Sequence, residues 1–193
     1  MLDTHARKYA QPTIQKTASG LLKVGLTPNQ VTITAFIIGT SSGVFVYFGQ
    51  PVLAIFVLWL SGFLDAVDGS MARLTKPSPF GTVMDVTFDR VVEISVILGV
   101  AFLYPEMMWA ALLLMASIVV SMTIFLTVGN VSDNNGVKSF RYQAGLAERT
   151  EGFIFLTVMI SFPSIVLWTT LMFFAVELFT AGQRFWEAKR ILS

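Results

Sequence analysis

Four aspartates lie close together in an otherwise strongly apolar stretch of the chain. Asp65 and Asp68 are three residues apart, and Asp85 and Asp89 are four residues apart. On helices, these spacings place the two members of each pair on one face. Carboxylates inside a membrane are costly and mark functional sites, and four that converge repel one another unless a cation lies between them. We therefore predict that two helical arms present the four carboxylates to bound metal.

The residue types around the aspartates indicate which metal and which ligand such a site takes. The chain has no cysteine and one histidine, whereas Mg²⁺ and Mn²⁺ suit carboxylate oxygens, and Mg²⁺ shares its coordination with substrate phosphates. Carboxylates on two helices could hold two ions, an arrangement used in phosphoryl chemistry. Gly69, Ala72 and Gly81 leave room for a ligand near the backbone, and Arg73 offers a bidentate phosphate donor. The pattern predicts a diphosphate site with Mg²⁺ or Mn²⁺, two ions being expected.

Two plainer roles for these residues stay open. Small residues such as Gly69 and Ala72 are common where membrane helices pack together, and such packing is compatible with ligand binding. Asp65 and Asp68 could instead form ion pairs with Arg73 or Arg90.

The composition indicates that membrane-spanning helices position this site. Charged residues make up 13% of the chain, against roughly 25% in soluble proteins, and a spanning helix needs about 20 mainly apolar residues. We expect an all-α integral membrane protein of one domain, residues 1–193, with six transmembrane helices preceded by an interfacial amphipathic helix. The expected spans are residues 31–49, 51–74, 83–104, 107–129, 149–162 and 164–186.

The positive charges predict how the helices are oriented. The chain has 13 lysines and arginines, and they lie before the first expected span, near the second and fourth connections between spans, or at the C-terminal end. Positive residues mark the cytoplasmic side of a membrane. Both termini and the aspartate site are therefore expected to face the cytoplasm, in a bacterial or archaeal cytoplasmic membrane.

The N-terminal segment differs from the spans. In residues 3–24, apolar and basic side chains alternate, which is typical of an amphipathic helix on a membrane surface; a solvated basic tail is the alternative. We expect Gly25 to end this helix. Thr27 is expected to cap the first span, with Pro28 at its first helical position.

The positions singled out above resemble the signature of the CDP-alcohol phosphotransferase family, also called the CDP-alcohol phosphatidyltransferase family. Its eight defining positions are occupied here by Asp65, Asp68, Gly69, Ala72, Arg73, Gly81, Asp85 and Asp89. Residues 20–33 are also similar to the start of the family's first membrane helix. The family transfers a substituted phosphate from a CDP-linked alcohol to the hydroxyl of a second alcohol and releases CMP. The resemblance therefore implies a metal-dependent transferase of phospholipid biosynthesis.

The resemblance also implies a role for each position of the signature. Asp89 would be the catalytic base, or would share the metals with the other aspartates. The metal ligands would be Asp65, Asp68, Asp85 and Asp89. The residues against the CDP group would be Asp65, Asp68, Gly69, Ala72, Arg73 and Gly81.

Further residues resemble the branch that includes the phosphatidylinositol phosphate synthases, which use CDP-diacylglycerol, or an archaeal lipid equivalent. They are VGLTP at 24–28, Asp89-Arg90, ERTE at 148–151 and Gln183-Arg184. This branch implies a phosphorylated acceptor, such as inositol phosphate or glycerol phosphate, and a basic pocket for it. The candidates for that pocket are Arg149, Arg184, Lys138 and Arg141.

One departure from this branch leaves the acceptor open. Its members place a Lys-x-Arg pair at the end of the fourth span, where this chain reads TVGNVSDNNG at 127–136. Serine or another non-phosphorylated alcohol is therefore an alternative acceptor, and a CDP-choline or CDP-ethanolamine type of donor is another. The polar residues at 130–135 could bind such an acceptor or form a solvated turn. Lys138, Arg141 and Arg149 could instead only set the topology.

Glu93 and Glu177 also lie within expected spans. Glu93 could extend the site, orient a cation or pair with Arg90, and Glu177 has no assigned role.

The family implies a homodimer, with GTSSG at 39–43 as a possible packing face, and we expect no nucleic-acid partner. A prenyltransferase that binds diphosphates through Mg²⁺ and a divalent-cation transporter are the rival classes. The absence of an internal repeat and the presence of Arg73 favour a transferase over a transporter.

Overall fold

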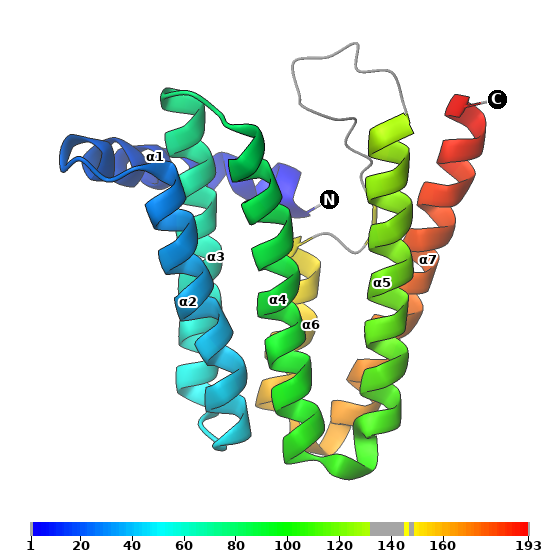
Figure 1. The fold of residues 1–193 in the computed structure, drawn as a ribbon. Coiled ribbons are helices and arrows are strands. Elements are labelled where there is room, and N and C mark those ends of the chain that lie inside the picture. The colour runs from blue at the N-terminus through cyan, green and yellow to red at the C-terminus, as the bar shows by residue number, and fades with distance from the viewer. Residues whose placement is uncertain (1, 132–144, 147–148, 193) are drawn as a thin grey trace. The chain divides into compact units, whose positions relative to one another are not determined.

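The computed structural model describes residues 2–131, 145–146 and 149–192, and side chains from residue 10 onward. Every regular element in these ranges is helical (Figure 1). In chain order the elements are α1 (Leu2–Lys23), α2 (Pro28–Tyr47), α3 (Pro51–Leu74), α4 (Pro79–Leu103), η1 (Pro105–Met107), α5 (Met108–Val131), α6 (Arg149–Ser161), η2 (Pro163–Ile165) and α7 (Val166–Leu192). They form two compact units, Leu2–Pro105 and Glu106–Ser193, and the single-domain organisation stays a prediction.

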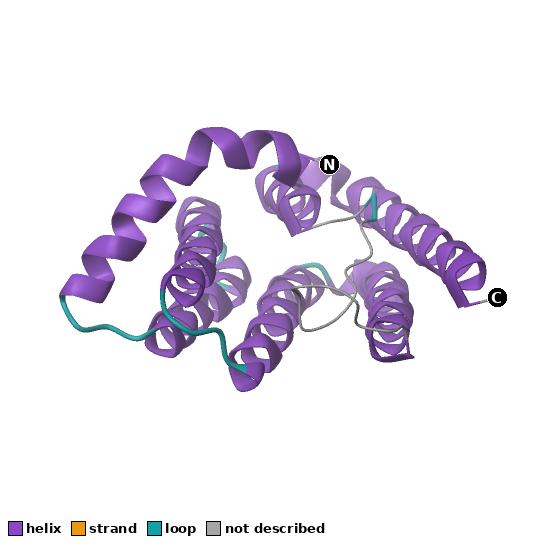
Figure 2. Cartoon of the chain, turned by 90° about the horizontal axis from the view of Figure 1, so that it is seen from above, coloured by secondary structure: helices purple, strands orange, loops and turns teal. Residues whose placement is uncertain are grey.

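Helix α1 lies across the other helices of the first unit. Figure 2 shows α1 in the plane of the view, whereas α2, α3 and α4 are seen nearly end-on. Its buried side chains, Ile14 and Ala18, join a cluster with Val31 of α2 and with Val67 and Met71 of α3. The remaining faces of α1 are mostly exposed where side chains are described. The alternation of apolar and basic residues therefore does correspond to an amphipathic helix.

The connection between α1 and α2 follows the predicted signals. Gly25 has a φ of 91°, a left-handed conformation that favours glycine at the end of a helix. Thr27 caps α2, because its hydroxyl accepts from the Gln30 N–H at 3.4 Å and its own N–H donates to the Gln30 side chain at 2.9 Å. Pro28 occupies the first turn. The expected end of the first helix and the expected cap are both confirmed.

The reversal between α3 and α4 fixes where the aspartate-bearing segments begin and end. Helix α3 ends at Leu74, and α4 begins at Pro79 after a cap by Ser78, whose hydroxyl accepts from the Gly81 N–H at 2.9 Å. Pro77 and Pro79 cannot donate a backbone hydrogen bond, so neither fits the interior of a helix. The two helices consequently run in opposite directions from this connection (Figure 1).

Helix α2 packs against both α3 and α4. The contact is close because glycines lie at the crossings: a Cβ atom on Gly39 would collide with Ser61 of α3, and one on Gly43 would collide with the Ser95 backbone of α4. Ser42, between them, donates to the Ala54 carbonyl at 2.9 Å. The GTSSG segment is thus a packing face within one chain, and its small residues give no support to a dimer contact there.

The second unit is built from the helices that follow Pro105. Helix α7 packs against α5 and α6, and the rings of Phe155 and Phe173 stack with their centroids 4.9 Å apart. Several hydroxyl side chains are buried on these helices, among them Ser117, Ser121 and Thr180. Hydroxyls in an apolar environment need partners, and Thr180 donates to the Val176 carbonyl at 2.9 Å.

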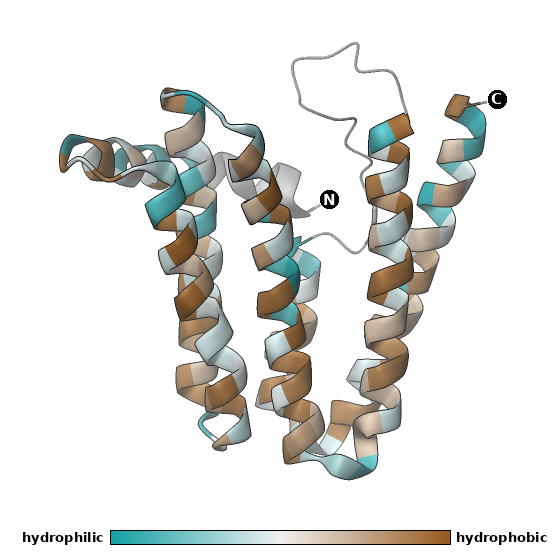
Figure 3. Ribbon diagram, in the orientation of Figure 1, coloured by the Kyte–Doolittle hydropathy of each residue, from teal (hydrophilic) through white to brown (hydrophobic). Residues whose placement is uncertain are grey.

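Four helical segments of the described residues are long and apolar enough to cross a membrane. They are Pro28–Tyr47, Pro51–Leu74, Pro105–Val131 and Pro163–Leu192. Figure 3 shows the hydrophobic colours along α2 and α3, with more hydrophilic colours at their ends near α1. Helix α4 carries four charged residues, at 85, 89, 90 and 93, and α6 has only 13 residues. These features indicate an integral membrane protein and confirm four of the six expected spans as candidates.

Candidate metal and diphosphate site

Three of the four aspartates meet in the first unit. Carboxylate oxygens of Asp65 and Asp68, from α3, and of Asp85, from α4, all lie within 4.8 Å of one another. Asp65 and Asp68 share one face of α3 because they are three residues apart, and the reversal at the Pro77–Pro79 connection brings Asp85 opposite to them. The predicted convergence of two helical arms is therefore present for these three side chains.

Asp68 is the most deeply buried member of this group, with a relative exposure of 4%. Its Oδ2 atom is buried and accepts no hydrogen bond from the described residues. The Thr32 hydroxyl of α2 contacts the Asp68 carboxylate and also lies 3.1 Å from the Pro28 carbonyl oxygen. Since a hydroxyl has one proton, Thr32 can donate either to Pro28 or to Asp68.

These contacts test whether the site suits a metal ion. A buried carboxylate oxygen without a donor is costly, and its cost disappears when the oxygen coordinates a cation. Among the described residues, the group consists of three carboxylates and contains no imidazole, and such oxygen ligands suit a hard cation such as Mg²⁺ or Mn²⁺. The donor set and the orientation of Asp68 both fit such an ion.

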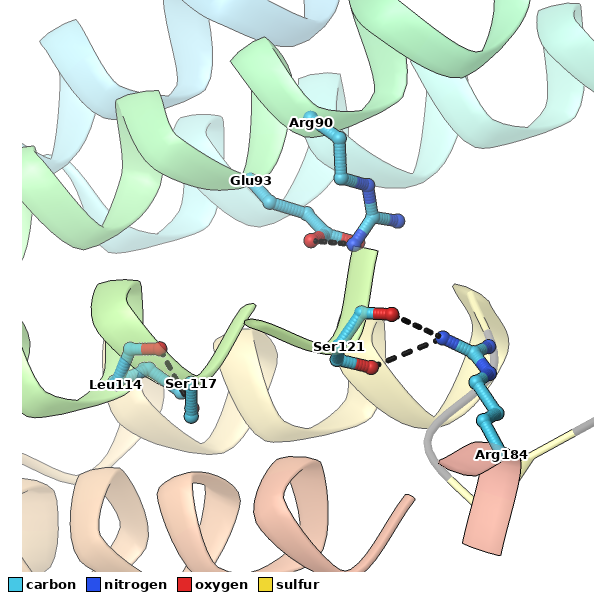
Figure 4. Close-up of polar contacts among 6 residues, drawn as sticks. All are labelled: Arg90, Glu93, Leu114, Ser117, Ser121 and Arg184. Carbon is cyan, nitrogen blue, oxygen red and sulfur yellow. Dashed lines mark hydrogen bonds and ion pairs between the residues drawn. The ribbon is translucent and has the colours of Figure 1, made fainter. Parts of the chain in front are cut away.

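Asp89 lies one turn beyond Asp85 on α4. It is outside the group of three, although the charges of Asp85 and Asp68 are close enough to act on it. Its neighbour Arg90 forms an ion pair with Glu93, with Nη1 2.6 Å from Oε2 (Figure 4). Of the roles left open for Glu93, the pair with Arg90 is the one that the structure contains.

The residues expected against the nucleotide have different surroundings. A Cβ atom on Gly69 would meet only Arg73, 3.5 Å from its Nη1, so the guanidinium of Arg73 lies over Gly69 on α3. Ala72 is half-buried on the same helix. A Cβ atom on Gly81 would lie 2.9 Å from the Ser78 hydroxyl oxygen and 3.4 Å from Oδ1 of Asn29. The Ser78 cap and Asn29 both limit the space for a side chain at residue 81.

The basic residues expected to bind the acceptor divide into two groups. Arg184 of α7 is buried, and its Nη1 donates to the Ser121 hydroxyl at 2.9 Å, with the Ser121 carbonyl oxygen at 3.5 Å (Figure 4). Arg149, at the start of α6, lies over the Phe153 ring at 5.4 Å from its centroid. Both belong to the second unit. Lys138 and Arg141 lie outside the described residues, as does most of the polar segment 130–135.

Sequence reasoning did not select Thr32 or Ser121. Both are hydroxyl residues in long apolar helices, where such residues usually donate to a carbonyl of their own helix. Neither spacing nor composition distinguishes them from Ser117, which donates to the Leu114 carbonyl at 2.7 Å. Thr32 falls within TPNQVT, directly after the predicted cap, and only the packing of α2 on α3 reveals its contact with Asp68. Glu177 is buried on α7, and the structure assigns it no role.

Comparison with known families identifies the class of protein that this fold and site define. The family model described as CDP-alcohol phosphatidyltransferase matches residues 25–176, which is most of the chain and includes all eight signature positions. The chain therefore belongs to the CDP-alcohol phosphatidyltransferase family, a family of transferases.

Individual relatives show how far the similarity extends. The chain is 38% identical to the archaetidylinositol phosphate synthase of Pyrococcus horikoshii over 102 residues, which are 52% of this chain and 54% of that protein. It therefore matches only about half the length of that relative. It is 29% identical to the inner membrane protein YnjF of Escherichia coli strain K12 over 195 residues, 97% of this chain and 95% of that protein.

The fold is shared with a solved structure. The Mycobacterium tuberculosis phosphatidylinositol phosphate synthase, in the crystal structure with CDP-DAG bound, has a TM-score of 0.77 and 23% identity to this chain, and the match covers 91% of this chain and 92% of that one. A second crystal structure of the same protein, in complex with manganese and citrate, also has a TM-score of 0.77, with coverage of 91% and 88%. At this identity, the likeness establishes the helical fold.

Proposed function

We propose that this protein transfers a phosphatidyl group from CDP-diacylglycerol, or from an archaeal lipid equivalent, to a hydroxyl of a small polar alcohol and releases CMP. The observation that carries this proposal is the convergence of Asp65, Asp68 and Asp85 within the family signature. A relative solved with CDP-DAG bound, and with the same fold, supports the choice of donor.

The three converging carboxylates would hold the metal, and Asp89 would complete the set. We expect Mg²⁺ or Mn²⁺ and two ions, because four carboxylates on two helices match the charge of two divalent cations. The manganese in the complex of the M. tuberculosis protein supports a hard cation. Bound metal would polarise the diphosphate and stabilise charge on the CMP leaving group.

The protein's own residues would carry the remaining chemistry. The hydroxyl oxygen of the acceptor attacks the phosphorus that bears the lipid. A new P–O bond forms there, and the bond between this phosphorus and the oxygen of CMP breaks. Asp89 would take the proton of the hydroxyl, directly or through one water. The products are a phosphodiester lipid and CMP.

The CDP group would lie against the small residues of the signature. A Cβ atom on Gly69 would lie 3.5 Å from Nη1 of Arg73, so the guanidinium of Arg73 lies over this part of α3, where it would bind a phosphate oxygen. Ala72, Gly81, Asp65 and Asp68 would complete these contacts.

A phosphorylated polyol, such as inositol phosphate or glycerol phosphate, is the acceptor that we favour. The P. horikoshii relative and the M. tuberculosis protein are both named as synthases of an inositol phosphate lipid. Arg149 and Arg184 would bind the phosphate, together with Lys138 and Arg141. Serine or another non-phosphorylated alcohol is the alternative acceptor, and a CDP-choline type of molecule is the alternative donor. The experiment below separates these alternatives.

The proposed arrangement in the membrane has six spans. Helices α4 and α6 would be the two spans beyond the four candidates, with the charges of α4 gathered at the site rather than facing lipid. Both termini, α1 and the aspartates would face the cytoplasm, where CDP-linked substrates and soluble acceptors are available. The family also leads us to expect a homodimer.

A turnover experiment tests the proposal and names the acceptor. The purified chain in detergent is given CDP-diacylglycerol and Mg²⁺ or Mn²⁺, and CMP release is followed with inositol phosphate, glycerol phosphate, serine, inositol, ethanolamine or choline. We expect release that depends on a phosphorylated acceptor and that disappears in Asp89→Asn. Release only with serine would replace the acceptor. If no acceptor in the panel gives CMP, from this donor or from CDP-choline, the proposed function is refuted, and metal flux in vesicles without CMP would favour a transporter.

A further inference from the structure

The last turns of α7 have an exposed apolar surface on the side away from the buried Arg184. Arg184, Ala181 and Ala188 are buried along one side of the helix. The other side exposes four large apolar side chains, which are Leu178, Phe179, Phe185 and Trp186. In a helix that is long and apolar enough to cross a membrane, such a side faces lipid.

Gly182 lies at the centre of these four side chains. Leu178 and Phe179 precede it by four and three residues. Phe185 and Trp186 follow it by three and four residues, so all of them share its face of the helix. A Cβ atom on Gly182 would have nothing within 4 Å. The glycine therefore leaves a shallow hollow in an apolar surface, with large side chains one turn before it and one turn after it.

Two cations follow this hollow toward the C-terminal end of α7. Lys189 and Arg190 come three and four residues after Trp186, so they share its face, and both are exposed. Nζ of Lys189 lies 5.8 Å from the centroid of the Trp186 ring. The exposed Glu187 offsets part of this charge, and the surface stays net positive. Figure 3 shows the change from hydrophobic to hydrophilic colours in these last turns.

The length of α7 places the two cations at the depth of lipid headgroups. The helix has 27 residues and is therefore about 40 Å long, whereas the hydrocarbon core of a bilayer is about 30 Å thick. A span that starts at Val166 reaches the far boundary after about 20 residues, near Trp186. Tryptophan rings are enriched at this boundary, and Lys189 and Arg190 come directly beyond it.

We propose that this end of α7 binds an anionic phospholipid of the membrane, with an acyl chain over the hollow at Gly182 and the headgroup phosphate against Lys189 and Arg190. Charge favours this occupant over a second copy of the chain. Two copies that crossed symmetrically at Gly182 would bring their own cations to the same depth, where they repel. None of these residues belongs to the aspartate site or to the acceptor pocket, so the proposal does not depend on the proposed function.

Trp186 makes lipid binding at this surface directly measurable. The full chain is reconstituted in phosphatidylcholine vesicles, and the quenching of tryptophan fluorescence by brominated phosphatidylglycerol is compared with that by brominated phosphatidylcholine of the same chain length. The other tryptophans are Trp59, Trp109 and Trp168, so the difference between the wild type and Trp186→Phe isolates the signal. We expect the anionic lipid to quench Trp186 at an about tenfold lower fraction of the vesicle lipid, the effect of two cations reduced by Glu187.

Variants of the exposed surface separate the two parts of the site. Lys189→Gln/Arg190→Gln should lose the preference for the anionic lipid. Lys23→Gln/Lys76→Gln is the matched control, because it removes the same charge from exposed positions of the first unit, and it should keep the preference. Gly182→Leu fills the hollow and should weaken the quenching by phosphatidylglycerol. Since nothing lies within 4 Å of the added Cβ atom, this variant should unfold at the same temperature as the wild type.

Four results would overturn the proposal. The first is equal quenching of Trp186 by the two brominated lipids. The second is an anionic preference in Lys189→Gln/Arg190→Gln that equals that of the control. The third is displacement of phosphatidylglycerol by soluble glycerol phosphate, which would assign the cations to a free phosphate rather than to a lipid. The fourth is a change of oligomeric state in Gly182→Leu with unchanged quenching, which would assign the hollow to a second copy of the chain.

Discussion

Thr32 supplies the prediction that depends most directly on the geometry of the site. Its side chain is buried, with a relative exposure of 6%, and its hydroxyl contacts the carboxylate of Asp68. When this hydroxyl donates to Asp68, it occupies one side of the carboxylate and leaves the buried Oδ2 atom to face a cation. We therefore expect Thr32→Val, which keeps the shape of the side chain and removes the hydroxyl, to weaken metal binding.

The size of the effect follows from the contact that is lost. A hydrogen bond to a charged group contributes about 1.5–3 kcal/mol, which corresponds to roughly 10- to 100-fold in affinity, the range seen when partners of metal ligands are removed. The hydrogen bond from Thr32 to the Pro28 carbonyl is lost as well, but Pro28 stays the first residue of α2. Without metal the hydroxyl can donate to the Pro28 carbonyl instead, so the free energy of unfolding without metal should fall by about 0.5–1.5 kcal/mol, the contribution of a neutral hydrogen bond.

The assay is Mn²⁺ binding to the purified chain, with free Mn²⁺ measured by electron paramagnetic resonance. Thr34→Val is the matched control, because Thr34 is on the same helix but exposed, and its hydroxyl donates to the Gln30 carbonyl at 2.8 Å. Thr32→Ser should bind Mn²⁺ nearly as well as the wild type. Equal Mn²⁺ affinity in Thr32→Val and Thr34→Val would refute the reasoning about Asp68.

Two further predictions concern the packing that holds the first unit together. Gly43→Ala should lower the free energy of unfolding by about 1–3 kcal/mol, because its Cβ atom would collide with the α4 backbone. Gly20→Ala is the control and should not lower it, because a Cβ atom on Gly20 has nothing within 4 Å. Equal unfolding midpoints of the two variants in detergent would contradict the close crossing of α2 and α4. Glu93→Gln should cost about 1–3 kcal/mol, because it removes the charge that pairs with the partly buried Arg90. An unchanged unfolding midpoint would show that the pair at 2.6 Å contributes nothing.

Much of the helical framework could be predicted because its signals are local. Thr27 followed by Pro28, and Pro77 with Pro79, start and stop helices through their own backbone chemistry. The structure places the corresponding boundaries at Pro28 and Pro79, a few residues before the expected span starts. Length and hydropathy support four spans directly. Hydropathy does not identify α4 as a span because its site residues are charged, and length does not identify α6 because its described part is short.

The aspartate cluster was also accessible from the sequence, since the spacing within each helix fixes the face and the proline-bearing connection fixes the reversal. The partners of those side chains were not. Thr32 and Ser121 contact side chains of other helices, Asp68 and Arg184, and one hydroxyl in an apolar segment looks like another in the sequence. GTSSG was considered a possible dimer face because small residues mark any close helix crossing. Only the contacts of Gly39 and Gly43 with Ser61 and Ser95 show that these glycines serve a crossing within the chain.

The central claim is that the carboxylates of α3 and α4 hold the metal used to transfer a phosphatidyl group from a CDP-linked lipid. Its most direct test follows CMP release by the wild-type chain with CDP-diacylglycerol and an acceptor, before and after removal of divalent metal by a chelator, beside Asp85→Asn. We predict that chelation stops the release, that added Mg²⁺ or Mn²⁺ restores it in the wild type, and that neither ion restores it in Asp85→Asn. CMP release that survives chelation, or an Asp85→Asn variant as active as the wild type, would contradict the account.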